Sequence, residues 1–380
     1  MKKNKARFLA LAEKYRDVGI APACEYFGRC GGCRFQDIAY DNQLLLKREY
    51  LAEILNGVCD VGAVRPSSPL HYRNRMDFVT AFGNIGLRKS GSHRHVVDID
   101  SCAIMQQKSN DAFRALRPLL AGIEDYNYLR HTGYLRYAVL RQARFTGQVM
   151  VNFVIAEREN RLRHVISGIV DRADSVSILL SDGLADLSFG EVIEDVKVGA
   201  IEEIFDGIRF AIAPNSFFQS NSEVALEMYR RIREEVSGNV LDLYSGVGSI
   251  SLFAAARADR MTGVEMLAEG VAMANRNREA NGIMNADFIC ADVLDFVKHN
   301  ETRFDTVVLD PPRSGMNPRV VRYIRQMAPE KIVYMSCNPV TFRDDCALLD
   351  EYAMQSFEAF DMFPQTPHIE TLAVLRRRGA

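Results

Sequence analysis

The sequence predicts an α/β fold in which a doubly wound parallel sheet follows an amino-terminal domain rich in β-strands. Short runs of Val, Ile and Phe, broken by Gly, Asn and Ser, occupy residues 61–205 and are typical of strands. From residue 239, apolar strand-like runs alternate with helical stretches, which is the pattern of a parallel sheet. We therefore expect two domains, residues 1–205 and residues 206–380.

Composition and charge narrow the class of protein. Of the 380 residues, 48% are hydrophobic, and 47 Lys and Arg against 49 Asp and Glu leave a net charge of −2. No field of one sign over the whole chain therefore attracts nucleic acid or a membrane. The longest apolar runs are too short for a membrane span, and Phe8–Ala12 is too short for a secretory signal. We expect a cytoplasmic protein that does not contact membranes.

In the first half, the strand-like runs predict an antiparallel sheet with a few helices; examples are Arg75–Val79, Tyr137–Leu140 and Val149–Val154. Two basic stretches accompany them, and their basic residues are Arg73, Arg75, Arg88, Lys89, Arg94, Arg130, Arg136, Arg141 and Arg144. They indicate either neutralisation of RNA phosphates or a solvated face of the sheet. The interleaved aromatics, Tyr72, Phe78, Phe82, Tyr134 and Tyr137, are suited either to stacking on bases or to packing in the core.

In the second half, strands and helices alternate. The predicted strands are 239–244, 261–265, 286–292, 304–310 and 331–337, and the runs 353–360 and 371–377 predict an antiparallel pair at the sheet edge. The five parallel strands end in polar or reactive residues, which are Tyr244, Glu265, Asp292, Asp310 and Cys337. Because ligands of such sheets bind beyond the carboxyl ends of the strands, we expect these five residues to converge on one site.

A glycine-rich turn, Asp242–Ser249, joins the first of these strands to a helix. Glu265 ends the strand that comes next, where a carboxylate can bind both hydroxyls of a ribose. Ser251 stands where dinucleotide-binding turns have a third glycine, so S-adenosylmethionine (SAM) fits better than a dinucleotide. An ordinary tight turn is the alternative. Asp292 is placed either to meet an adenine amino group or to cap the next helix.

Asp310-Pro311-Pro312-Arg313 follows the fourth strand as a stiff loop, because proline cannot extend a sheet. In SAM-dependent enzymes that act on bases, an acidic or amide residue before Pro-Pro holds the target ring. Enzymes that methylate amino groups end this motif in an aromatic residue, whereas this chain has Arg313. The motif therefore favours a chemistry other than amino methylation.

Cys337 ends the fifth strand, and Pro339 begins the next helix. A thiol at a helix amino terminus has a lowered pKa, which suits a nucleophile. Carbon 5 of uracil needs such a nucleophile, because addition of a thiolate to carbon 6 makes carbon 5 an enolate carbon that attacks the SAM methyl group. Glu370 is the candidate base for the carbon 5 proton. The alternatives are a buried, inert Cys337 and a solvated Glu370 beside His368.

Three thiols, Cys24, Cys30 and Cys33, lie in one short stretch near the start of the chain, and Cys102 follows much later. Four cysteines without histidine suit an iron–sulfur cluster or structural zinc. Zinc sites usually come as two close pairs, so three close ligands and one distant ligand favour a cluster of four irons and four sulfurs. Zinc remains the alternative, and Cys59 lies outside the pattern.

Together these motifs resemble one family, the SAM-dependent RNA uracil-C5 methyltransferases with an iron–sulfur cluster, over nearly the whole chain. The motifs that occur in the family's order are the cysteine motif, His71–Asn74, Gly86–Arg88, Phe217–Gln219, Asp242–Gly248, Asp310–Arg313, Ser336–Pro339 and His368–Glu370. The resemblance implies a Rossmann-like SAM-methyltransferase sheet and a β-rich, RNA-binding domain that carries the four-cysteine site. It also implies that the segment 36–67 docks on the catalytic domain.

The resemblance assigns roles to individual residues. It implies that Cys337 is the nucleophile and Glu370 the base. The implied SAM contacts are Gln219, Tyr244, Ser249, Glu265, Asp292 and Asp310, and the implied ligands of the [4Fe-4S] cluster are Cys24, Cys30, Cys33 and Cys102. The stretch before Cys24 is short, so we expect no amino-terminal RNA-binding barrel of the kind that many members have. Ser249 stands where several members have Asn.

We therefore expect methylation of carbon 5 of a specific uridine in structured RNA, with 23S ribosomal RNA favoured over transfer RNA. The protein is expected to act as a monomer without an obligate protein partner. A methyltransferase for small molecules or proteins is one alternative, because it would share the glycine-rich turn. A non-catalytic iron–sulfur RNA-binding protein is the other.

Overall fold

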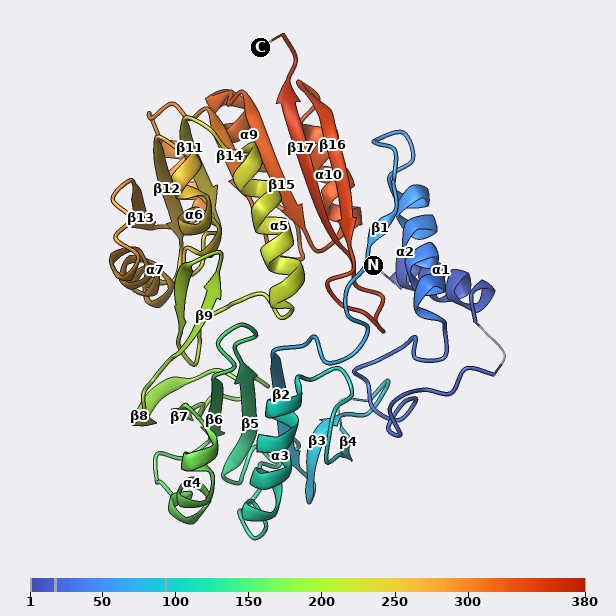
Figure 1. The fold of residues 1–380 in the computed structure, drawn as a ribbon, viewed down its shortest axis with the longest axis vertical. Helices are drawn as coiled ribbons and strands as arrows, with labels where there is room; N and C mark the ends of the chain where they lie inside the picture. The colour runs from blue at the N-terminus through green and yellow to red at the C-terminus, as the bar shows by residue number, and fades with distance from the viewer. Residues whose placement is uncertain (1, 17–18, 93, 380) are drawn as a thin grey trace.

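A computed structural model describes residues 2–16, 19–92 and 94–379 of the chain (Figure 1). Its strands form two large sheets and one hairpin, and the expected α/β architecture with a β-rich amino-terminal part is confirmed. None of the helices in the described part of the chain is long and apolar enough to cross a membrane.

The eight-stranded sheet contains the predicted alternation of strands and helices. Its strands are β1 (Val64–Arg65), β11 (Asn239–Leu243), β12 (Arg260–Glu265), β13 (Ala286–Cys290), β14 (Thr306–Leu309), β15 (Lys331–Ser336), β16 (Tyr352–Phe360) and β17 (Glu370–Arg377). Their order is β1-β16-β17-β15-β14-β11-β12-β13, and β11 to β15 are mutually parallel. The strand order therefore reverses between β11 and β14, where a crevice forms at the carboxyl edge.

Helices cover both faces of this sheet because its strands are apolar on both sides. The helices that follow the hairpin linker are α5 (Ser222–Glu235), α6 (Ser249–Ala254), α7 (Ala268–Ala280), α8 (Val293–His299), α9 (Pro318–Met327) and α10 (Pro339–Leu348). Leu241 and Leu243 point into a core shared with α8, α9 and α10, whereas their neighbour Val240 points into the core under α5 and α6.

The predicted antiparallel pair is present, but it does not form the edge of the sheet. β17 lies between β15 and β16 and is antiparallel to both, and the short β1 then adds to β16 in parallel. The amino-terminal residues that contain β1 thus complete the sheet that the carboxyl-terminal half builds.

The seven-stranded sheet forms the lower part of the molecule in Figure 1. Its strands are β2 (Arg75–Ala81), β3 (Asn84–Arg88), β4 (Val96–Asp98), β5 (Leu135–Gln142), β6 (Val149–Ile155), β7 (Ser175–Leu180) and β8 (Glu191–Lys197). Helices α3 (Gln107–Leu119) and α4 (Arg163–Ile169) pack on one face. The expectation of a purely antiparallel sheet is wrong at one place, because α4 forms a crossover that makes β6 and β7 parallel.

A hairpin and two amino-terminal helices also pack on the eight-stranded sheet. The hairpin of β9 (Ile201–Phe205) and β10 (Ile208–Ile212) packs its apolar side into the core under α5. Helices α1 (Lys2–Lys14) and α2 (Tyr40–Ile54) pack on the eight-stranded sheet, with Phe8, Leu46 and Leu51 inside its core. Helix α1 was not expected from the sequence.

Candidate active site

The five polar strand ends lie along one edge of the eight-stranded sheet. Strands β11 to β15 are parallel neighbours, so the residues at or just after their carboxyl ends lie along the edge at which the strand order predicts a crevice. These residues are Tyr244, Glu265, Asp292, Asp310 and Cys337. The crevice is thus lined by acids, a phenol and a thiol.

The glycine-rich turn after β11 needs its glycines for packing and backbone geometry. Gly248 has φ +75°, and a Cβ there would lie 2.6 Å from the ring of Phe288. Tyr244 also has a positive φ, +67°, which is uncommon for a bulky residue and marks a strained position at the strand end. The carboxylate of Glu265 fastens the turn, since it accepts hydrogen bonds from the backbone of Gly246 (3.1 Å) and Leu267 (2.9 Å).

Two other predicted ligand residues already have protein partners. The Ser249 hydroxyl lies 2.9 Å from the Tyr229 hydroxyl, beneath the turn. One oxygen of Asp292 accepts hydrogen bonds from the backbone of Leu294 and Asp295, so Asp292 is the N-cap of α8. The capping alternative for Asp292 is therefore confirmed, and the cap leaves its second oxygen without a bond to the helix.

Asp310 and Gln219 meet across the crevice. The Gln219 amide donates a 3.4 Å hydrogen bond to Asp310, which brings the segment before α5 to the end of β14. Burial, together with the nearby Asp242, raises the pKa of Asp310 to about 8. The raised pKa favours the protonated form of Asp310, which would present both a donor and an acceptor to the crevice.

Cys337 and Glu370 lie side by side because of the strand register. Ser336 in β15 pairs with Thr371 in β17, so the next position along the antiparallel ladder places Cys337 opposite Glu370. The Glu370 side chain is buried, and burial raises its pKa well above the usual range, with a further rise from Asp310. The alternative of a solvated Glu370 is therefore wrong.

The expected lowering of the Cys337 pKa is also wrong. Burial, aided by the charges of Glu370 and Asp310, raises the pKa of Cys337 to about 11. Arg313 opposes this rise but does not outweigh it. Asn338, not Cys337, is the N-cap of α10, so Cys337 lies just before the helix. Cys337 is nevertheless partly exposed and not sealed in the core.

Arg313 and His368 form a pair near Cys337 and Glu370 that was not predicted from the sequence. The Arg313 guanidinium donates a 2.6 Å hydrogen bond to Nδ1 of His368, and Asn338 donates to the Arg313 carbonyl (2.9 Å). Burial and the positive charge of Arg313 lower the pKa of His368 to about 4, so the imidazole is a neutral acceptor. The pair bridges the motifs after β14 and before β17, which sequence spacing does not connect.

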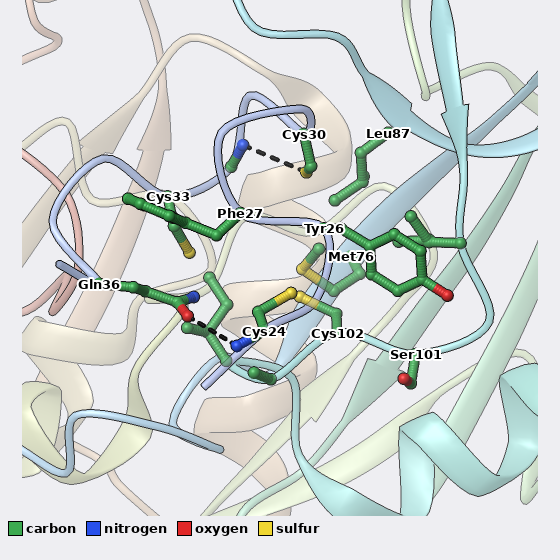
Figure 2. A pocket seen from close by; sticks show the side chains of 14 residues that line it. Cys24, Tyr26, Phe27, Cys30, Cys33, Gln36, Met76, Leu87, Ser101 and Cys102 are labelled. Atoms are coloured by element: carbon green, nitrogen blue, oxygen red, sulfur yellow. Dashed lines mark hydrogen bonds between the residues drawn. The ribbon is translucent and has the colours of Figure 1, made fainter. Parts of the chain in front are cut away.

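The four predicted metal ligands line a second pocket, in the amino-terminal part of the molecule (Figure 2). Cys24, Cys30 and Cys33 come from one loop and Cys102 from the segment after β4. None of the described residues that line this pocket is His, Asp or Glu, so its four cysteines are the strongest candidate metal ligands in it. Within the described chain, however, no three His, Cys, Asp or Glu side chains are arranged to hold a metal ion.

Burial governs the state of these thiols. It raises the pKa of Cys33 to about 12 and that of Cys102 to about 11, and it also raises the pKa of Cys30. Mutual repulsion among the thiolates adds to each rise. Protonated thiols repel one another less than thiolates do, but each must lose its proton before it can bind a metal. The cluster therefore stays a prediction at this point.

Five of the nine basic residues in the two stretches contact other parts of the β-rich domain or its neighbours, whereas Lys89, Arg94 and Arg130 are exposed, so contact with RNA phosphates stays a prediction. Arg136 is fully buried and donates to the carbonyls of Ser181 and Gly183, while Arg141 is buried against the carbonyl of Ser216. Others form ion pairs, namely Arg75 with Asp77, Arg88 with Asp186 and Arg144 with Glu223. The aromatics Tyr72, Phe78, Tyr134 and Tyr137 are core residues, and only Phe82 of that set is exposed.

Comparison with known proteins gives a consistent picture. A family described as tRNA (Uracil-5-)-methyltransferase matches residues 204–378. The chain is 35% identical to a tRNA (uracil(54)-C(5))-methyltransferase of Pyrococcus furiosus, over 99% of this chain and 92% of the relative. It is 38% identical to the tRNA (uracil(54)-C(5))-methyltransferase of Pyrococcus abyssi, over 94% of this chain and 86% of that relative.

A solved structure resembles the whole arrangement. The crystal structure of Pyrococcus abyssi tRNA (uracil-54, C5)-methyltransferase in complex with S-adenosyl-L-homocysteine superposes with a TM-score of 0.82 at 36% identity. The match covers 90% of this chain and 85% of that chain, so it includes both large sheets.

Proposed function

Because the chain belongs to the family of RNA uracil-C5 methyltransferases, we propose that it methylates carbon 5 of a uridine in transfer RNA, at the position that corresponds to 54. The names of its relatives support transfer RNA, so the expected preference for ribosomal RNA is given up. The observation that carries the proposal is the juxtaposition of Cys337 and Glu370 at the crevice that Asp310 lines.

The reaction follows from these groups. The Cys337 thiolate adds to carbon 6 of the uracil, and the electron pair of the ring double bond moves to carbon 5 as an enolate. Carbon 5 attacks the methyl group of SAM, whose carbon–sulfur bond breaks to leave S-adenosylhomocysteine. Glu370 then removes the carbon 5 proton, the ring double bond re-forms, and the bond from carbon 6 to Cys337 breaks.

The surrounding residues prepare this sequence. Bound SAM carries a positive sulfonium centre. Its charge favours the thiolate of Cys337 over the thiol and so counters the raised pKa of this residue. The raised pKa of Glu370 makes its ionised form a stronger base than an ordinary carboxylate, and a positive sulfonium centre nearby favours that ionised form. Protonated Asp310 is suited to hydrogen bonding with the polar edge of the uracil, and Gln219 holds it in place.

We assign SAM to the carboxyl edge beside the glycine-rich turn. The proposed contacts are Gln219, Tyr244, Ser249, Glu265, Asp292 and Asp310. The fastening of Glu265 to the turn supports this assignment, because it orients a carboxylate toward the place where a ribose would lie. The S-adenosyl-L-homocysteine in the relative's crystal structure supports it as well.

We further propose that Cys24, Cys30, Cys33 and Cys102 hold a [4Fe-4S] cluster and that the chain divides into domains near residue 205. A pocket lined by four thiols and by no carboxylate or imidazole among its described residues fits a thiolate-bound cluster. When bound, the cluster would supply iron–thiolate bonds that join the amino-terminal loop to the segment of Cys102. Zinc remains the alternative metal.

The test uses purified protein, radiolabelled SAM and three RNAs: a transfer RNA transcript, the same transcript with uridine 54 replaced by cytidine, and fragments of 23S ribosomal RNA. The proposal expects label in the first transcript only, recovered as 5-methyluridine. Label in ribosomal fragments alone, or equal label in both transcripts, would contradict the substrate assignment.

A further inference from the structure

The loop between β16 and β17, residues 361–369, leads directly into Glu370, yet much of its support comes from the opposite end of the chain. Tyr72 donates to the carbonyl of Pro364 (2.9 Å), and the backbone of Asp361 donates to the carbonyl of Arg65 (2.9 Å). In Figure 1 this loop lies beside the amino-terminal segment. The position of the proposed base therefore depends on residues from the first part of the sequence.

Gln365 is the centre of this contact. Its carbonyl accepts hydrogen bonds from the backbone of Arg34 (2.7 Å) and Phe35 (3.2 Å), immediately after Cys33. Its side chain and backbone also form two bonds with the buried Gln43 of α2. The Gln43 amide donates to Gln365 Oε1 (2.9 Å), and the Gln365 backbone donates to Gln43 Oε1 (3.0 Å).

The backbone of Gln365 is held in an unfavourable conformation. Its φ is +67°, which a residue with a side chain adopts at a cost and keeps only where its surroundings impose it. Gln43 is buried and also donates to the carbonyls of Phe35 and Ile38, so it is rigid itself. The contacts between Gln43 and Gln365 therefore select one conformation of the loop.

A second contact fixes the start of the same loop. Lys47, one turn after Gln43, forms a fully buried ion pair with Asp361 (2.5 Å) and donates to the carbonyl of Phe363 (3.2 Å). From Gln365, the chain reaches Glu370 through Pro367, which restricts the backbone, and through the buried Ile369. A shift at Gln365 is therefore transmitted to Glu370.

We propose that Gln43 is a positioning residue for proton removal: through Gln365 it holds the loop that places Glu370 against the reacting carbon. The proposal rests on the proposed function, because it requires Glu370 to be the base. Gln43 does not contact Cys337, so loss of Gln43 slows the removal of the carbon 5 proton but leaves thiolate addition and methyl transfer in place.

Gln43→Leu and Gln365→Leu test this. In each variant leucine keeps roughly the volume of glutamine without its polar atoms, so the hydrogen bond from the Gln43 amide to Gln365 Oε1 is lost. Leu51→Ala is the matched control. Leu51 lies on the same helix and is fully buried, and its replacement removes core packing away from the loop. Each variant is assayed with ordinary transfer RNA and with transfer RNA that contains 5-fluorouridine.

The two RNAs separate the steps. A fluorine at carbon 5 cannot be removed as a proton, so trapping of 5-fluorouridine RNA reports only addition and methyl transfer. With ordinary RNA, a misplaced base leaves the methylated RNA bonded to Cys337. We expect turnover to fall about tenfold and the covalent RNA–protein fraction to rise about fivefold in both loop variants, with 5-fluorouridine trapping within about twofold of the unmodified protein.

The contrary outcomes are distinct. If both loop variants slow trapping and turnover by the same factor, as the control Leu51→Ala is expected to do, the positioning role is overturned while the proposed function stands. If the unmodified protein fails to trap 5-fluorouridine RNA at all, the proposed function is overturned, and the positioning role with it.

Discussion

Cys337 and Glu370 are distant in the sequence but occupy opposing positions at the end of one antiparallel ladder, one step beyond the pair Ser336–Thr371. This register sets the backbone spacing of the two residues, and the loop that leads into Glu370, residues 361–369, completes the placement of the carboxyl group. The charge of Glu370 also contributes to the raised pKa of Cys337. In the proposed reaction, this placement lets Cys337 and Glu370 act on two adjacent carbons of one ring.

Replacement of the thiol tests the covalent step. Cys337→Ala is expected to keep SAM binding, measured by calorimetry, and to lose about 100-fold or more of its turnover together with all trapping of 5-fluorouridine RNA. Cys290→Ala is the control, because Cys290 is exposed and lies at the end of β13. Unchanged turnover in Cys337→Ala would remove this residue from the mechanism.

The charges around Cys337 predict how fast it reacts with iodoacetamide in the absence of substrates. The rate rises with pH toward a pKa of about 11, because only the thiolate reacts. Arg313→Gln removes a charge that lowers this pKa, so alkylation at about pH 9 slows a few-fold.

Glu370→Gln removes a charge that raises the pKa of Cys337, so alkylation of Cys337 at about pH 9 becomes a few-fold faster. Mass spectrometry of the Cys337 peptide measures both rates. Shifts in the same direction for the two variants would contradict the electrostatic account.

Asp242 predicts the pH dependence of stability. Its side chain is fully buried and burial raises its pKa to about 7. One oxygen accepts from Ser251, and the other has no hydrogen-bond partner among the described residues. The unfolded carboxyl ionises near its ordinary value of 3.8, so the stabilisation from this group is complete below that pH and is lost as the pH rises through about 7.

Asp242→Asn stays neutral at every pH. The Tm of the unmodified protein is therefore expected to fall relative to that of the variant between about pH 4 and pH 8. Differential scanning calorimetry without ligands measures this, with the exposed Asp171→Asn as control. A constant difference between the two Tm values would show that Asp242 does not titrate in this range.

The cysteine pocket predicts a metal content. Protein purified without oxygen is expected to be brown and to contain about four iron and four sulfide per chain. Cys102→Ala loses them, whereas Cys59→Ala retains them, because Cys59 does not line the pocket. Zinc in place of iron would support the alternative metal, and a colourless protein without metal would contradict both.

The sequence predicted the catalytic half well because its signals are local. Each parallel strand is a short apolar run that ends in a polar residue, and each boundary from β11 to β15 lies within a few residues of expectation. Cys337 and Glu370 were predicted from motifs at strand ends, where topology alone brings them together.

Features that depend on contacts distant in sequence were missed or wrong. The pKa of Cys337 depends on the burial produced by other segments, and the pair of Arg313 and His368 joins two separate motifs. Arg136 and Arg141 look like solvated cations in the sequence, yet backbone carbonyls from other segments surround them. Charge and periodicity carry no signal for such partners.

The pairing of β1 with β16 has a consequence for the nascent chain. Val64 and Arg65 leave the site of synthesis early, but their partners Ala359 and Phe360 are made only near the end of translation. Lys47 of helix α2 likewise lacks its ion-pair partner until Asp361 has been synthesised. The apolar side chains of this early segment thus stay without their final neighbours while most of the chain is being made, and the eight-stranded sheet is complete only after β16 has emerged.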